Sequence, residues 1–232
     1  MKILSIDSST YVMGVSLSED EQVIGEYITN VKKNHSIRLM PAIQQVMSDC
    51  DITPNMLHRI VVAKGPGSYT GVRIGISIAK SLAWSLNIPL IGVSSLEHLA
   101  WNGKDFNGYV CPLMDARRNQ LYTGLYRFNG EVMIPSIEDQ NILIDDWLEK
   151  LKGLQEPILF IGADLPMHQS IIQLHLGEQA VFSPYIDWNP RPSLLAYIGL
   201  RKEAEPLHSF VPSYLRLAEA EANWLASNES SH

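Results

Sequence analysis

The loop at residues 65–71 is the densest cluster of residues suited to ligand binding. It reads Gly65-Pro66-Gly67-Ser68-Tyr69-Thr70-Gly71, follows an apolar run and opens a helical run that carries Arg73. Glycines let backbone N–H groups approach an anion, and a helix start favours negative charge. The loop lacks the Gly-Lys-Ser/Thr ending of a Walker loop, and Thr70 replaces the third glycine of a dinucleotide fingerprint. An anion-binding loop and a tight structural turn both remain open.

Two aspartates end comparable apolar runs and offer a second kind of chemistry. Asp7 is followed by Ser8-Ser9-Thr10, and Asp115 by Ala116-Arg117-Arg118. Carboxylates facing each other across a cleft could organise a Mg²⁺-bound phosphate, with Thr10 and Arg118 beside them. Neither turn has the glycines that bring backbone against phosphate, so the alternative is that both aspartates are turn or cap residues.

Other catalytic patterns are missing from the sequence. The seven histidines show no ligand spacing, and neither His-Glu-x-x-His nor Cys-x-x-Cys occurs, which argues against a bound transition metal. The nucleophile elbow Gly-x-Ser-x-Gly is absent too, so hydrolase activity has no support. Cys50 and Cys111 are too few for a disulfide scaffold and suit a reducing cytosol.

The elements that must position these residues are predicted twice in the same order. The first half has expected strands at 3–6, 12–17, 23–28, 59–63 and 90–93, and expected helices at 36–50, 72–86 and 95–101. Pro41 should kink or delay the first of these helices. The second half has expected strands at 109–114, 121–128, 132–137 and 158–161, and expected helices at 146–151, 167–176 and 193–202. This order predicts an α/β protein with a duplicated βββαβα unit.

The repeat sets the expected domains. Residues 1–104 form the first unit and residues 105–232 the second, with the tail after about residue 205 a candidate to pack back on the first. Residues 228–232 are polar and should fray.

The two long helices of the first half carry more apolar surface than one sheet contact needs. Small residues recur every fourth position at Gly71, Gly75, Ala79 and Ala83, and large apolar residues cover most other sides of that helix. Leu39 and Val46 widen the apolar face of the earlier helix. A protein–protein interface and a wide internal core face are both consistent with this pattern.

Composition limits the partners. The 232 residues include 18 Lys and Arg against 25 Asp and Glu, a net charge of −7, which argues against a stand-alone nucleic-acid binder. No apolar run approaches the ~18 residues of a membrane span, and the opening residues reach the charge of Asp7 before a signal-peptide core could form. We therefore expect a cytoplasmic protein without membrane contact.

Several segments together resemble the TsaB (YeaZ) family. They are the opening from Ile3 to Thr10, His35-Ser36-x-x-Leu39-Met40-Pro41-x-Ile43, Gly65 to Gly75, Ile88 to Glu97, Met114 to Arg118 and Tyr214-Leu215-Arg216. The resemblance is dense over residues 1–128 and looser beyond. It implies an actin-like, hexokinase-like ATPase (ASKHA) fold of two ribonuclease-H-like halves.

The resemblance also implies a function. Members act as non-catalytic auxiliary subunits that activate the catalytic subunit TsaD, together with the ATPase TsaE. TsaD transfers threonylcarbamoyl from threonylcarbamoyl-AMP to form N6-threonylcarbamoyladenosine (t6A) beside the anticodon of tRNAs that read codons beginning with adenine. The implied partners are thus a TsaD-like subunit and a TsaE-like ATPase, a homodimer in isolation, and tRNA only indirectly through the complex.

The site residues carried over by resemblance form two sets. A partner interface would comprise His35, Ser36, Leu39, Met40, Ile43, Val46, Gly71, Gly75, Ala79, Leu82 and Ala83. A nucleotide or interface loop would comprise Asp7, Thr10, Gly65, Gly67, Ser68, Thr70, Gly71, Arg73, Asp115 and Arg118. No cofactor is required, although ATP or ADP with Mg²⁺ could sit at the interface.

The catalytic relatives of this superfamily bind their metal through an Asn-His-Leu-Glu-Gly-His stretch. Ser95 and Leu99 stand at the ligand positions here, and His98 is one place out of register. A serine hydroxyl or a leucine side chain cannot replace imidazole as a metal ligand. We therefore expect no bound metal and no catalytic residue in this chain. The alternatives are an ATP-dependent small-molecule kinase of the actin-like superfamily, using Asp7 and Asp115, and a metallopeptidase, which lacks its ligands.

Overall fold

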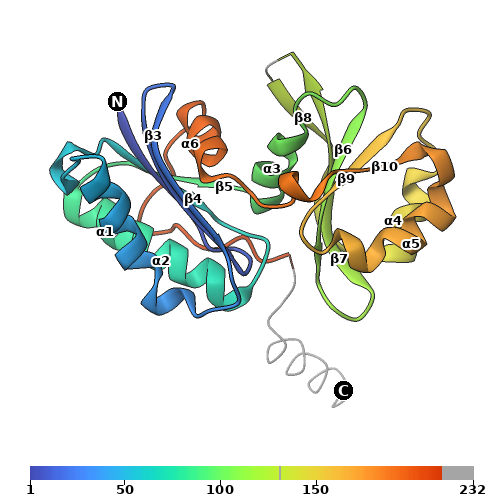
Figure 1. Ribbon diagram of the computed structural model, residues 1–232, viewed down its shortest axis with the longest axis horizontal. Coiled ribbons are helices and arrows are strands. Elements are labelled where there is room, and N and C mark those ends of the chain that lie inside the picture. The colour runs from blue at the N-terminus through green and yellow to red at the C-terminus, as the bar shows by residue number, and fades with distance from the viewer. Residues whose placement is uncertain (131, 216–232) are drawn as a thin grey trace.

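The computed structural model describes residues 1–130 and 132–215, which form two five-stranded sheets side by side (Figure 1). The first sheet has the order β3-β2-β1-β4-β5. Its strands are β1 (Lys2–Asp7), β2 (Val12–Glu19), β3 (Gln22–Asn30), β4 (Arg59–Ala63) and β5 (Leu90–Val93). The first three strands are antiparallel neighbours, whereas β4 runs parallel to β1 and β5 parallel to β4.

The second sheet repeats this arrangement strand for strand, in the order β8-β7-β6-β9-β10. Its strands are β6 (Tyr109–Asp115), β7 (Gln120–Asn129), β8 (Val132–Leu143), β9 (Ile158–Ile161) and β10 (Ala180–Phe182). The pairings β6–β7 and β7–β8 are antiparallel, and β6–β9 and β9–β10 are parallel. The predicted duplication is therefore confirmed at the level of topology.

Both faces of the first sheet are covered by helices, and successive side chains of a strand point alternately to the two faces. Leu4 and Ile6 of β1 pack into the core under α1 (Leu39–Asp49) and α2 (Tyr69–Leu86), whereas Ile3 points to the opposite core, where α6 (Pro192–Leu200) lies. The second sheet is covered on one face by α4 (Ile144–Leu151) and α5 (Leu165–Leu176). Its other face receives α3 (Ser95–Ala100).

The two halves therefore exchange helices. The helix α3 follows the first sheet in the chain but packs on β6 and β7, whereas α6 follows the second sheet but packs on all five strands of the first (Figure 1). Phe210 is buried in the core of the first half, and Ser213 N–H donates to the Lys64 carbonyl. Residues 192–215 thus lie against the first half, although they come from the second half of the sequence.

Most predicted elements are present, with informative differences. A short 3-10 turn at His35–Ile37 precedes α1, so the delay expected from Pro41 is confirmed. The strand predicted at 132–137 runs on to Leu143, and β10 was missed because it is a half-buried strand of three residues. No helix of the described residues is long and apolar enough to cross a membrane. Residues 228–232 and Arg216 lie outside the described part.

Candidate functional site

A cleft lies where the two halves face each other. Its cavity of about 610 Å³ is lined from the first half by the β1–β2 turn, the segment 32–35 and the start of α2, and from the second half by the ends of β6 and β9. Seven of the predicted residues line it: Thr10, His35, Gly67, Ser68, Thr70, Gly71 and Asp115. Asp7, Gly65 and Arg73 do not, and Arg118 lines a neighbouring cavity of about 460 Å³.

The glycine-rich loop packs tightly against the β1–β2 turn. Ser68 caps α2 by accepting from Gly71 N–H at 3.2 Å, and its own N–H donates to the Ser9 carbonyl at 2.7 Å. A Cβ on Gly67, whose φ is +153°, would come within 2.2 Å of that carbonyl oxygen. These contacts give the glycines a packing role, because only glycine fits so close an approach of two backbones.

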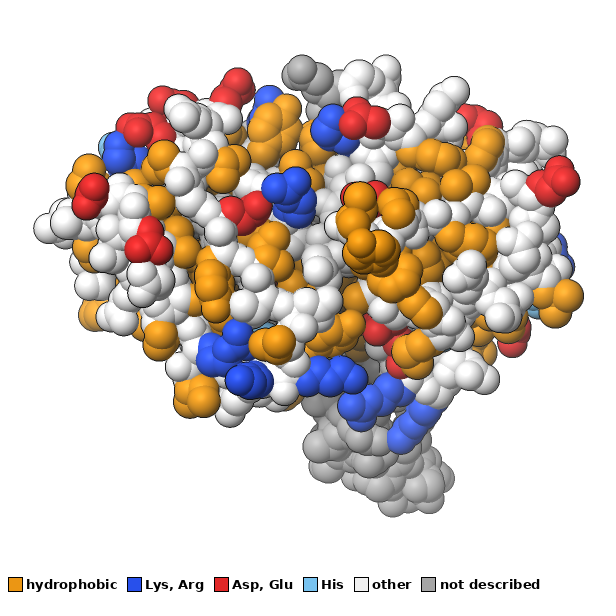
Figure 2. Space-filling view, viewed as in Figure 1, with side chains coloured by type: hydrophobic (Ala, Val, Ile, Leu, Met, Phe, Trp, Pro, Cys, Tyr) orange, Lys and Arg blue, Asp and Glu red, His pale blue; other side chains and the backbone are white. Residues whose placement is uncertain are grey.

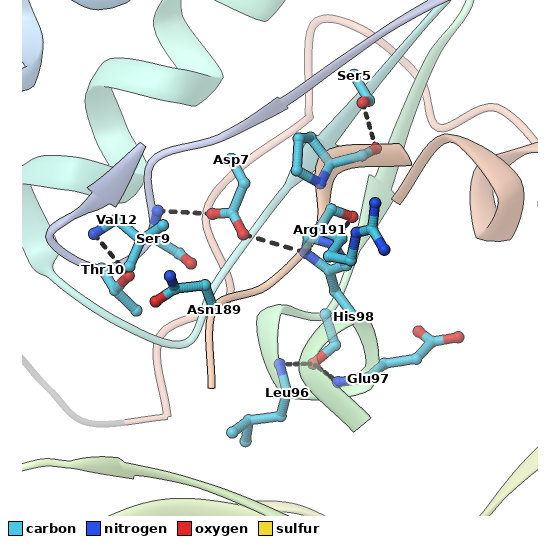
Figure 3. Close-up of polar contacts among 12 residues, drawn as sticks. Ser5, Asp7, Ser9, Thr10, Val12, Leu96, Glu97, His98, Asn189 and Arg191 are labelled. Carbon is cyan, nitrogen blue, oxygen red and sulfur yellow. Dashed lines mark hydrogen bonds and ion pairs between the residues drawn. The ribbon is translucent and has the colours of Figure 1, made fainter. Parts of the chain in front are cut away.

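Asp7 lies behind the cleft, fully buried and bonded to His98 of α3 (Figure 3). His98 Nδ1 donates to Asp7 Oδ2 at 3.0 Å, and Nε2 donates to the Arg191 carbonyl at 2.6 Å. Both partners are acceptors, so these bonds require the doubly protonated ring. Burial alone would raise the pKa of Asp7, but bonds from His98 and Ser9 N–H and the charge of His98 hold it below its ordinary value.

The expectation that Asp7 and Asp115 face each other across the cleft is therefore wrong for Asp7. Its carboxylate is hydrogen-bonded to His98 instead. His98 in turn links β1 to α3 and to Arg191, the residue before α6. In the sequence, His98 stood out only because it lies one place away from a metal-ligand position of the superfamily. Nothing in the local sequence marks it as the partner of Asp7, which is 91 positions away.

Asp115 keeps contact with the cleft. Its Oδ1 lies 3.2 Å from His168 Nε2 of α5, and its Oδ2 accepts from Arg117 N–H at 3.2 Å. Its side chain is 21% exposed, against 2% for Asp7. Asp164, a cleft residue that the sequence did not single out, accepts from Asp115 N–H at 2.9 Å.

The turn after Asp115 has an uncommon backbone. Three consecutive residues, Arg117, Arg118 and Asn119, have φ of 63°, 53° and 57°, in the left-handed region that favours glycine. Each such residue costs roughly 1–2 kcal/mol, so the turn holds its two arginines at an energetic cost. Asn119 is of a residue type that tolerates this region, whereas nothing in the sequence marks the two arginines for it.

The predicted interface residues divide into two groups. Leu39, Ile43, Val46, Gly71, Gly75, Ala79 and Ala83 are buried in the core of the first half, and His35 is buried with its ring bonded to the Thr10 carbonyl. Direct docking through these side chains is therefore wrong, because the sheet beneath already covers them. Ser36 is exposed, and Met40 and Leu82 are half-buried.

The two helices nonetheless keep a half-buried apolar edge beside their mostly polar exposed positions. Ile74, Ile78 and Leu82 recur every fourth residue of α2, half-buried, and together with Met40 of α1 they pack against the core from its edge. Ile37, between these helices and the cleft segment, is 71% exposed. Ile74 and Ile78 were missed as interface candidates because the stripe of small residues beside them was the stronger pattern.

Comparison with known proteins now decides the family. A family model described as TsaD: tRNA N6-adenosine threonylcarbamoyltransferase matches residues 22–224. The tRNA threonylcarbamoyladenosine biosynthesis protein TsaB of Bacillus subtilis (strain 168) is 52% identical over 229 residues, covering 99% of this chain and 100% of that relative. The chain belongs to the TsaB family.

Solved structures agree on the fold. YeaZ from Pseudomonas aeruginosa matches with a TM-score of 0.73 at 20% identity, covering 92% of this chain and 99% of that one. The ethanolamine utilization protein EutJ from Carboxydothermus hydrogenoformans matches with a TM-score of 0.50 at 12% identity, over 86% and 90% of the two chains. This TsaB-family chain has the ASKHA-like fold of two subdomains that the family resemblance implied.

The residues at the metal-ligand positions of the superfamily do not fit a metal. Ser95 and Leu99 are buried, and neither offers an imidazole. His98 has no free lone pair, because both of its ring nitrogens donate to oxygen. No cluster of three His, Cys, Asp or Glu suited to a metal occurs in residues 1–130 and 132–215.

Proposed function

We propose that this chain is a non-catalytic auxiliary subunit for t6A formation in tRNA. It binds and activates a TsaD-like catalytic subunit, and a TsaE-like ATPase joins them near their junction. The observation that carries the proposal is the 52% identity to a TsaB protein over essentially the whole of both chains. The match to the TsaD family model supports a common ancestry of scaffold and catalyst.

The lack of turnover follows from the chemistry at the ligand positions. A buried serine and a buried leucine cannot hold a transition metal, and the neighbouring histidine is committed to Asp7. The threonylcarbamoyl transfer must then occur on the partner. The chain supplies an ordered surface that the catalytic subunit binds.

The docking surface in this proposal is the exposed side of α1 and α2. Ile37, Met40, Ile74, Ile78 and Leu82 form an apolar edge, and we call this set the helix edge. Matching helices on a related fold would pack there, burying side chains that water now contacts. The same edge would serve the homodimer when the partner is absent.

The kinase alternative loses the carboxylate pair on which it depended, because Asp7 does not reach the cleft. ATP or ADP with Mg²⁺ near the loop from Gly65 to Arg73 stays a prediction within the complex.

Reconstitution tests the proposal. Purified chain, TsaD-like subunit, TsaE-like ATPase, ATP, threonylcarbamoyl-AMP and unmodified tRNA are combined, and t6A is measured by nucleoside mass spectrometry. Omitting this chain should abolish product over several turnovers, and the chain alone should make none. Full activity without the chain would contradict an activating role, and product from the chain alone would contradict its inactivity.

A further inference from the structure

The rim of the cleft is basic although the whole chain has a net charge of −7. Lys32 and Lys33 from the first half and Arg117 from the second line the same cavity and are exposed. Arg118 is exposed beside Arg117 and lines the neighbouring cavity. Figure 2 shows Lys and Arg side chains gathered along the lower edge of the molecule, beneath its middle. We call the set Lys32, Lys33, Arg117 and Arg118 the basic rim.

Three of these cations have no carboxylate partner. In residues 1–130 and 132–215, no ion pair involves Lys32, Lys33 or Arg117. Lys32 Nζ lies over the ring of Tyr11, 5.7 Å from the ring centroid. Many basic residues elsewhere are paired with a carboxylate, among them Lys2, Lys64, Arg127, Lys152, Arg191 and Lys202. Among the described residues, Lys32, Lys33 and Arg117 therefore hold positive charge that no carboxylate pairs with.

The backbone at the rim is held in a costly conformation. Arg117 and Arg118 both lie in the left-handed region, where glycine would sit without strain. A turn that keeps two arginines there is best explained by what their side chains contact, since strain of this kind concentrates at functional sites.

The charges inside the cleft limit the kind of anion. Asp115 and Asp164 line the cavity and are half-buried, so their carboxylates disfavour a compact phosphate group deep inside. The cations are exposed and come from both halves of the chain. A long polyanion lying across the opening would contact the cations of both halves without approaching the carboxylates.

Aromatic side chains continue this surface. Tyr69, which also lines the cavity, stacks on Tyr214 with ring centroids 5.3 Å apart, and the Arg73 guanidinium lies 4.0 Å from the Tyr69 centroid. The two tyrosines are 44% and 45% exposed. Exposed rings beside cations suit nucleic acid, in which bases stack while phosphates pair with Lys and Arg.

We propose that the basic rim binds the phosphate backbone of tRNA directly. The identity of the RNA rests on the proposed function; the contact itself rests on the charge, strain and aromatic surface described above. The proposal rests on Lys32, Lys33 and Arg117, and three such cations make a weak site, which agrees with a chain that needs its partner to hold tRNA firmly.

The test is a salt titration of tRNA binding. The full chain is mixed with fluorescently labelled, unmodified tRNA, and anisotropy gives the affinity at salt concentrations from about 50 to 200 mM. The double variant Lys32→Ala/Lys33→Ala should bind roughly 10- to 50-fold more weakly at about 100 mM salt, and the slope of log K against log salt should fall by about 1.5. Arg117→Ala should give about half that change in slope.

The matched control removes the same charge elsewhere. Lys150→Ala/Lys152→Ala changes two exposed lysines at the end of α4 and should leave affinity and slope within twofold of the wild type. Polyglutamate and ATP with Mg²⁺ serve as competitors. Equal binding by wild type and the Lys32/Lys33 variant overturns the proposal, as does tRNA binding too weak to measure at 50 mM salt. Displacement by polyglutamate at matched charge, or by ATP at equimolar concentration, also overturns it in favour of an acidic protein or a nucleotide.

The outcome can be separated from that of the proposed function. If cells lacking the chain keep their t6A, the function fails, but the binding data stand. If t6A depends on the chain while wild type and rim variants bind tRNA equally, the direct contact alone fails.

Discussion

The two halves carry the same turn at the same place and use it differently. Each first strand ends in an aspartate that accepts from the N–H two residues on, at 2.8 Å from Ser9 and 3.2 Å from Arg117. Each aspartate also has a histidine partner, His98 for Asp7 and His168 for Asp115. The first pair is fully buried, whereas in the second Asp115 lines the cleft and His168 lines the neighbouring cavity.

This difference teaches how a duplicated fold divides its tasks. The pair in the first half stabilises the junction, because it joins β1 to α3 and, through the Arg191 carbonyl, to α6. The turn in the second half keeps exposed cations in a strained backbone. The buried pair thus serves stability, whereas the turn after Asp115 presents exposed cations at the cleft.

The largest expected effect comes from making the same isosteric change in both pairs. Asp7→Asn should lower the free energy of unfolding by about 3–5 kcal/mol, because it removes the charged partner of a fully buried pair. Asp115→Asn should cost only about 0–1 kcal/mol, because that pair is partly hydrated. Urea denaturation followed by circular dichroism measures both. Equal losses would erase the distinction between the halves.

The next effect concerns partner binding. Ile78→Glu on the helix edge should weaken binding to the TsaD-like subunit by about 2 kcal/mol or more, roughly 30-fold, because a carboxylate would be buried unpaired. Ile134→Glu on β8, 49% exposed in the second half, is the matched control and should change affinity less than twofold. Calorimetric titration measures both affinities. A comparable loss from the control would move the interface to the second half.

A third prediction follows from the pKa of Asp7. A carboxyl whose pKa is lower in the folded state than its unfolded value near 3.9 adds stability above that value and loses it as pH falls through the folded pKa. The stability difference between wild type and Asp7→Asn should therefore shrink as the pH falls from about 5 to below about 4. Urea unfolding across this range measures it. A difference that stays unchanged across this range would contradict the lowered pKa of Asp7.

The smallest expected effect comes from the backbone conformation of the turns after Asp7 and Asp115, which differ in their φ angles. Arg117→Gly should raise the free energy of unfolding by about 0.5 kcal/mol, because relief of the left-handed strain exceeds the entropy cost of glycine. Ser9→Gly at the matching position has no such strain to relieve and should destabilise the protein. Thermal unfolding of the two variants compares them. A loss of stability in Arg117→Gly would remove the strain argument for the basic rim.

Much of the fold was predictable, since it rests on local patterns. Apart from Arg59, the residues of 59–63 are apolar on both faces of the strand, which marks it as a buried strand. The turns that begin at Asp7 and Asp115 revealed that the unit is repeated. The exchange of α3 and α6 was not predictable, because their apolar faces fit either sheet and only the assembled chain decides between them.

The site was predicted less well, and for physical reasons. Leu39 and Ala79 were assigned to an interface because an apolar face looks the same whether a sheet or a partner covers it. Gly67, Ser68, Thr70 and Gly71 of the predicted loop line the cleft, and their contact with a nucleotide or a partner stays a prediction. Lys32, Lys33 and Arg117 were missed, and Arg118 was predicted only as part of a nucleotide or interface loop, because a basic rim forms only when segments 85 positions apart meet.

The central claim is that this chain is needed for t6A although it does not make the modification itself. The most direct test is nucleoside mass spectrometry of bulk tRNA from the source organism after depletion of the protein, and again after restoring it with wild type or Ile78→Glu. The account predicts loss of t6A on depletion, recovery with wild type and poor recovery with the helix-edge variant. An unchanged t6A level after verified depletion would contradict it.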